Sequence, residues 1–148
     1  MTTDLGWQSG GTMTVPAESA LRVRPATLEA FIQAGKDAWL RHGGTGTRIP
    51  YLSALLSIGL ADAHRDEVRD VVPTVTTDTD LRRRTVDLNP GVHQLLTETV
   101  QSEYLRLEAN VAKWKILDAI LTVAVAHQDE LDSQLELDDG GKAAGKAA

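Results

Sequence analysis

Hydrophobic and polar residues follow the same succession of patterns twice along this chain. In the first stretch, Leu21 and Val23 alternate with Arg22 and Arg24, which is the period of a half-buried strand. Pro25 follows directly, and proline suits the first turn of a helix because the amide hydrogen that it lacks would have no partner there. The helix that it predicts carries one stripe of apolar residues at intervals of three and four: Leu28, Phe31, Ile32, Gly35, Trp39 and Leu40.

A glycine-rich segment, GGTGT at 43–47, predicts the end of this helix and a turn. Thr47 is then expected to cap a second helix, with Pro50 in its first turn. The second helix is apolar around most of its circumference, and such a helix is expected to be buried on several sides. Its apolar residues are Ile49, Tyr51, Leu52, Leu55, Leu56, Ile58, Gly59 and Leu60.

The second half of the chain repeats this order of elements. Val86 and Leu88 alternate with polar neighbours, and Pro90 opens the following helix. Asn110 is expected to cap a last helix over about 111–131. The first of these two helices has its apolar stripe on Val92, Leu95, Leu96, Val100, Tyr104 and Leu105.

Sliding the chain against itself by 65 positions aligns the two halves without a gap. The apolar segment 51–61 then falls on 116–126, and Pro25 falls on Pro90. A single offset that aligns both prolines and a long apolar pattern predicts an internal duplication.

The duplication predicts the organisation of the whole chain. Residues 1–17 are expected to form a flexible N-terminal arm, and 18–70 a first strand–helix–helix unit. Residues 71–80, rich in threonine and with one proline, are interpreted as an extended linker to a second unit at 81–134. An acidic and then Gly/Ala/Lys-rich tail occupies 135–148.

Neither unit is expected to stand alone. The predicted strands, Ser19–Arg24 and Arg84–Asn89, would each have unpaired edges, and each apolar second helix would face water. Antiparallel pairing of the strands and interlocking of the helices removes both costs. We therefore predict a mainly α fold with a short two-stranded antiparallel β-ribbon, in which two tandem β-α-α units form an intramolecular pseudo-dimer.

These patterns resemble the ribbon-helix-helix (Arc/MetJ-like) family of DNA-binding proteins, in a tandem form within one chain. The resemblance rests on RTVDLNPGVHQLL at 84–96 with KILDAIL at 115–121, and on LRVRPATLEAF at 21–31 with YLSALL at 51–56. It implies sequence-specific binding of double-stranded DNA through a ribbon in the major groove. The role implied is that of a transcriptional repressor or a plasmid partition or conjugation accessory factor, with further self-association on DNA as a second expectation.

In such a ribbon, the side chains that face away from the helices point at the bases, and the amino ends of the second helices meet phosphates. The residues expected to read bases are Arg22, Arg24, Arg83, Thr85 and Asn89. The residues expected to bind phosphate are Thr45, Thr47, Arg48, Asn110, Lys113 and Lys115.

One acidic residue, Asp87, is expected on the same face of the ribbon. The offset of 65 places it on Arg22, so we expect the two to lie opposite each other as a cross-strand pair of opposite charge. Such a pair would make the two strands unequal, and the preferred DNA site need not be a palindrome.

The charge of the chain bears on this interpretation, because DNA-binding proteins usually carry a basic surface. The net charge is −6, but the charges are segregated: 128–139 holds six acids and no bases, whereas LRRR at 81–84 is basic. This overall acidity keeps open an alternative, a protein-interaction or antitoxin-like module on the same scaffold that does not bind DNA.

The chain offers little for other classes of function. It has no cysteine, no basic and apolar leader at its start, and no apolar run of the length that spans a membrane, so we expect a cytoplasmic, nucleoid-associated protein without a membrane partner. AHRDE at 63–67 and AHQDE at 126–130 each combine one histidine with a carboxylate, a pairing too common by chance to predict a metal site. No catalytic spacing is present. We therefore expect no enzyme activity, no cofactor and no small-molecule substrate.

Overall fold

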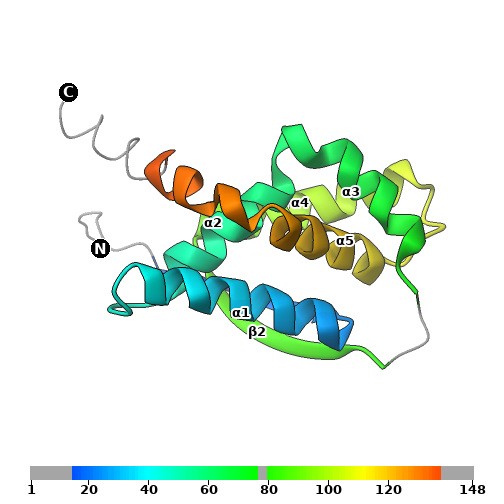
Figure 1. Cartoon of the computed structure of the whole chain (residues 1–148). Coiled ribbons are helices and arrows are strands. Elements are labelled where there is room, and N and C mark those ends of the chain that lie inside the picture. The colour runs from blue at the N-terminus through cyan, green and yellow to red at the C-terminus, as the bar shows by residue number, and fades with distance from the viewer. Residues whose placement is uncertain (1–14, 77–79, 138–148) are drawn as a thin grey trace, which may run out of the picture.

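The computed structural model describes residues 15–76 and 80–137, in which helices pack on one face of a two-stranded antiparallel sheet (Figure 1). None of the helices in these two ranges combines the length and the apolar character that crossing a membrane requires. The elements of the first half are β1 (Ala17–Val23), α1 (Pro25–Arg41), α2 (Ile49–Leu60), η2 (Asp62–His64), α3 (Arg65–Val71) and η3 (Val72–Thr74). Those of the second half are β2 (Arg82–Leu88), α4 (Pro90–Arg106), α5 (Lys113–Ala126) and η4 (Gln128–Glu130), and residues 131–137 are again helical.

The predicted mainly α architecture with a two-stranded antiparallel ribbon is confirmed. Helices α1 and α4 begin at Pro25 and Pro90, as predicted from the position of proline after each alternating segment. Strand β2 begins and ends 65 residues after β1, and α4 begins and ends 65 residues after α1. The structure describes the chain from Val15, so most of the predicted N-terminal arm at 1–17 lies outside the described residues, as does most of the tail at 135–148.

The predicted caps of the two second helices are wrong. Helix α2 is preceded by Arg48 rather than Thr47, and no side chain caps it. The Trp39 indole shapes the turn instead, because its N–H donates to the carbonyl oxygens of Thr45 and Gly46. Helix α5 begins at Lys113 after an extended residue, three positions beyond the cap expected at 110.

The chain between α2 and β2 contains further helical turns, which extend into the start of the predicted linker at 71–80. Residues 65–71 form α3 and 72–74 form a short 3₁₀ helix, η3. Val68 and Val72, one helical turn apart, are both buried in the main hydrophobic core. Burial of both valines stabilises these helical turns, and of the predicted linker the residues 71–76 and 80 belong to the described part of the chain.

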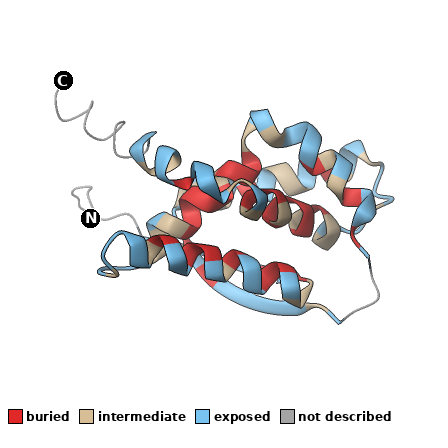
Figure 2. Cartoon of the chain, viewed as in Figure 1, coloured by how far each residue is buried: buried red, intermediate tan, exposed pale blue. Residues whose placement is uncertain are grey.

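Helices α2 and α5 form the centre of the core, and their buried faces meet in Figure 2. Leu55 and Leu56 of α2 and Ile116 and Leu121 of α5 are completely buried. At Gly59 the helices come so close that a Cβ atom would lie 2.5 Å from the carbonyl oxygen of Ile120. The prediction that both second helices are buried on several sides is therefore confirmed.

Each long helix begins against a side chain from the other half of the chain. The amide of Arg24, directly before α1, donates to the Asp118 carboxylate of α5 over 3.1 Å. The amide of Asn89, directly before α4, donates to the Ser53 hydroxyl of α2 over 2.9 Å. Because neither helix has a side-chain cap of its own, these contacts supply acceptors that the local sequence lacks.

Glu103 of α4 is a buried carboxylate that ties α4 to α3. It accepts two hydrogen bonds from the Arg69 guanidinium, at 3.0 and 2.9 Å, and one from Arg106 at 3.0 Å. The hydrogen bonds from Arg69 hold the pKa of Glu103 below its usual value, with Arg106 acting in the same direction and burial opposing both.

Replacing Glu103 with glutamine is expected to lower stability near neutral pH and to reduce acid sensitivity. A carboxyl group with a depressed pKa stabilises the fold above its unfolded-state pKa, and that contribution disappears as the pH falls through the folded-state value. The wild type is therefore expected to exceed E103Q by about 1–2 kcal/mol in unfolding free energy at pH 7, and by much less at pH 3. Urea unfolding at both pH values measures the difference. Glu98→Gln, an exposed change on the same helix, is the control and should leave both values within about 0.5 kcal/mol.

Candidate nucleic-acid interface

The ribbon has one buried face and one exposed face, as alternation predicted. Leu21, Val23, Val86 and Leu88 point into the core, with exposures of 0 to 7%. The strand along the lower edge of Figure 2 is largely exposed. Since opposite residues of an antiparallel pair share a face, the outward side chains are those of Glu18, Ala20, Arg22, Arg83, Thr85 and Asp87.

The charges on the outward face are grouped by sign. Arg22 lies opposite Arg83, and Glu18 lies opposite Asp87, with Ala20 and Thr85 at the centre. Within 15–76 and 80–137, no carboxylate forms an ion pair with Arg22 or Arg83. The ribbon thus presents a basic end and an acidic end.

The predicted pairing of Arg22 with Asp87 is therefore wrong. In an antiparallel ladder the sequence separation between opposite residues changes by two at every step, so a separation of 65 occurs at one pair alone. That pair is Ala20 with Thr85. Arg22 lies two residues after Ala20, so it faces the residue two positions before Thr85, which is Arg83 and not Asp87.

Two of the five predicted base-reading residues lie beyond the ends of the ribbon. The Arg24 side chain is turned onto α5, where its guanidinium donates to both oxygens of the buried Asp118, at 3.1 and 2.8 Å. Its assignment as a base reader is wrong, because the interior carboxylate holds it. Asn89 immediately precedes α4 and its side chain is exposed, next to the end of the ribbon rather than on its outward face.

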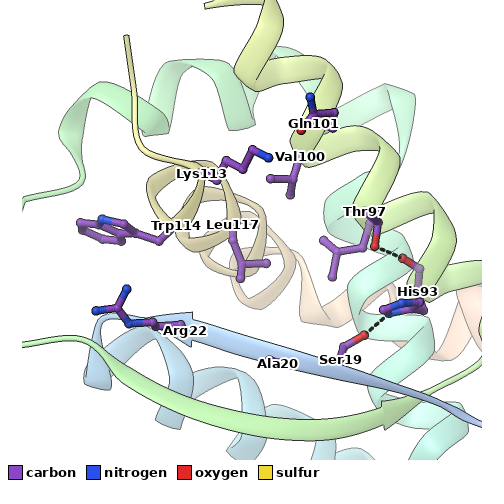
Figure 3. Close-up of a pocket in the computed structure, with 11 residues that line it drawn as sticks. Ser19, Ala20, Arg22, His93, Thr97, Val100, Gln101, Lys113, Trp114 and Leu117 are labelled. Atoms are coloured by element: carbon purple, nitrogen blue, oxygen red, sulfur yellow. Dashed lines mark hydrogen bonds between the residues drawn. The ribbon is translucent and has the colours of Figure 1, made fainter. Parts of the chain in front are cut away.

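Two grooves flank the ribbon, each between a strand, a first helix and the start of a second helix. The first has a volume of about 420 Å³ and lies between β1, α4 and α5, with Trp114, Leu117 and Val100 on its apolar wall (Figure 3). At its base, the Ser19 hydroxyl is hydrogen-bonded to the His93 ring. The second, of about 380 Å³, is lined by residues of β2, α1 and α2.

The predicted phosphate-binding residues divide into those at a groove and those away from one. Arg48 and Thr47 line the second groove, and Lys113 lines the first. The cation of Arg48 lies 4.8 Å from the centre of the Trp39 ring, and that of Lys113 lies 5.0 Å from the Tyr104 ring. Thr45, Asn110 and Lys115 do not line either groove.

The structure also adds residues that the sequence did not single out. Glu18, which lies opposite Asp87, was missed because the first strand was expected to start at Ser19. Arg84 and Trp114 were missed as groove residues. Alternation predicts that Arg84 faces inward, and Arg84 does lie opposite the buried Leu21. At this end of the ribbon, however, the Arg84 side chain is exposed.

No family model matches the sequence, and comparisons with curated proteins and with solved structures found no similar protein.

Proposed function

We propose that this chain is a tandem ribbon-helix-helix protein without enzymatic activity that binds double-stranded DNA through the outward face of its ribbon. The observation that carries the proposal is the juxtaposition of Arg22 and Arg83 on an exposed two-stranded ribbon. Like charges directly opposite each other in a sheet are unfavourable. Binding of a polyanion reverses that cost, because both guanidinium groups then acquire acceptors.

The side chains on the outward face of the ribbon suit the major groove of DNA. A two-stranded ribbon fits into that groove, where arginine pairs with the O6 and N7 atoms of guanine and a threonine methyl contacts thymine. Carboxylates such as Glu18 and Asp87 accept from the amino group of cytosine. Because the basic and acidic pairs occupy opposite ends of the ribbon, the preferred site is expected to be unsymmetrical, with guanine under Arg22 and Arg83.

Phosphates are expected at the two grooves beside the ribbon. Arg48 and Lys113 stand at the amino ends of α2 and α5, where free backbone N–H groups and the positive end of the helix dipole favour an anion. One cation on each side of the ribbon suits a duplex whose two strands pass on either side of it.

The tandem pseudo-dimer is part of the same proposal. The 65-residue spacing of strands and first helices supports it, as does the central pair Ala20–Thr85, which has that separation. Gly59 and Ala124 are also 65 residues apart, and a Cβ on the glycine would lie 3.1 Å from that of the alanine. Contacts between equivalent residues are expected along a two-fold axis.

Replacing both Arg22 and Arg83 with alanine is expected to weaken DNA binding by about 30-fold or more, since each arginine contact to a guanine is worth about 1–3 kcal/mol. The measurement starts from a pool of random duplexes enriched on the full chain at about 50 mM salt. The enriched duplex is then titrated by fluorescence anisotropy at two salt concentrations, where wild-type affinity should fall steeply with salt.

The matched control is the double variant Arg41→Ala with Arg65→Ala. It removes the same two charges from exposed sites outside the ribbon, where the side chains pair with Asp132 and Asp62. We expect the control to lose less than about fivefold in affinity, as a loss of general electrostatic attraction would predict. Absence of enrichment at low salt, or equal losses in the two double variants, would contradict the proposal.

One observation favours a second candidate, a protein-interaction module. The first groove is walled mainly by apolar side chains, among them Leu96, Trp114 and Leu117, and such a surface suits a segment of another protein. If the chain enriches no duplex, this candidate takes precedence. The biological role within the leading proposal, as a repressor or as a partition or conjugation factor, follows from the location of the enriched sequence.

A further inference from the structure

Two histidines and two glutamates from distant parts of the chain meet at the ends of the central helices. His64 closes η2, just after α2, and Glu67 lies in α3. His127 directly follows α5, and Glu130 lies in η4. The two imidazole rings are stacked, with their centres 4.0 Å apart and their planes inclined by 26°. We call these four residues the His–Glu cluster.

The carboxylates of the cluster bridge the two halves. The Nε2 atom of His127 lies 2.7 Å from a Glu67 oxygen, and that of His64 lies 3.1 Å from a Glu130 oxygen. The second Glu130 oxygen lies 3.3 Å from Nδ1 of His127. Each glutamate therefore reaches the histidine of the other segment, which a sequence motif of one histidine and one carboxylate does not predict.

We propose that the His–Glu cluster binds a divalent transition metal ion of the Zn²⁺ type. Imidazole nitrogen and carboxylate oxygen are the donors that Zn²⁺ accepts in the absence of cysteine. One donor atom each from His64, His127 and Glu130 all lie within 4.8 Å of one another. In a tetrahedral site with bonds of about 2.0–2.2 Å, donor atoms are roughly 3.4 Å apart, so the side chains need to draw in by up to about 1.4 Å.

The charge of the cluster also fits a divalent cation. Two neutral imidazoles and two carboxylates carry a charge of −2, which one such ion neutralises.

The backbone positions of the ligands are well defined. The amide of His64 donates to the carbonyl of Ala61 over 3.0 Å, and that of His127 donates to Val123 over 3.1 Å. Both follow helices that pack together at Gly59. Histidines fixed just after packed helices need little backbone reorganisation on binding, whereas the exposed Glu130 retains the freedom to close on the ion.

The experiment uses the untagged full chain, treated with a chelator and titrated with Zn²⁺ at pH 7.5. We expect one ion per chain in calorimetry and a rise of several degrees in Tm, because the ion joins segments of both halves and binds only the folded state. His64→Gln and His127→Gln are each expected to weaken Zn²⁺ binding by about 100-fold or more. Mg²⁺, which prefers oxygen ligands, should raise the Tm little or not at all.

The matched control is His42→Gln, which removes an exposed histidine paired with Asp132 outside the cluster and should retain wild-type affinity. A second measurement needs no variant: the chain has four histidines, and Zn²⁺ should shift the ring NMR signals of two of them. Assignment of those signals to His64 and His127 supports the proposal. Shifts at His42 or His93 instead, an absence of Zn²⁺ binding, or unchanged binding in both cluster variants would overturn it, whatever the outcome for DNA.

Discussion

Replacing Gly59 with alanine is expected to lower the free energy of unfolding by about 2–3 kcal/mol, although alanine is the better helix former. A methyl group there would lie 2.5 Å from the carbonyl oxygen of Ile120 and 3.1 Å from the Cβ of Ala124. The nearest atom belongs to the backbone of α5, so the clash cannot be relieved by a rotamer change. The two central helices have to move apart, and overpacking of a tight core typically costs about 1–3 kcal/mol or more.

Urea unfolding followed by circular dichroism measures this loss, and Gly91→Ala is the matched control. Gly91 lies in the first turn of α4, and a Cβ added to it meets no atom within 4 Å. Alanine at this site is expected to be neutral or to stabilise by up to about 1 kcal/mol, through its higher helix propensity. If Gly59→Ala were as stable as Gly91→Ala, the close approach of α2 and α5 would be wrong.

Replacing Asp118 with alanine is expected to cost about 3 kcal/mol. This carboxylate is completely buried in α5, yet it accepts hydrogen bonds from the Arg24 backbone and guanidinium and from the Thr27 hydroxyl. Removing one partner of a buried pair typically costs about 3–5 kcal/mol, since the other is left without an acceptor. The lower figure applies here because the Arg24 side chain is 26% exposed and can turn toward water.

Asp118→Asn separates the contribution of the hydrogen bonds from that of the charge, because asparagine keeps an acceptor oxygen but is neutral. We expect it to lose less free energy of unfolding than Asp118→Ala. Asp37→Ala on the exposed side of α1 is the control for loss of one carboxylate, and we expect a change within about 0.5 kcal/mol. Equal unfolding curves for the two alanine variants would show that Asp118 does not hold the start of α1.

The first helices and the ribbon could be predicted from the sequence, because their signals are local. Alternation around Leu21 and Val86 gave the strands, and Pro25 and Pro90 gave the helix starts to the residue. Helix α3 could not be predicted in this way. Its sequence is short and polar, and the burial of Val68 and Val72 that stabilises it depends on neighbours elsewhere in the chain.

The candidate site was predicted in outline and corrected in detail. Arg22, Arg83 and Thr85 do lie on the outward face of the ribbon, as their parity in the alternation predicts. Their cross-strand partners could not be derived from the sequence. Alternation assigns each residue to one face of the ribbon, but it does not determine which residues of the two strands lie opposite each other. The inward turn of Arg24 follows from a buried acceptor 94 residues away.

By itself, the sequence determined which segments are strands and which helices are buried, since the period of apolar residues and the backbone limits of proline act over a few positions. The tertiary structure alone decided the pairing of Arg22 with Arg83, the contact of Asp118 with Arg24 before α1, and the meeting of the two His–Glu motifs. Each of these joins residues more than 60 positions apart. Their relative placement depends on how the central helices cross and pack, and a local pattern contains no information about that crossing.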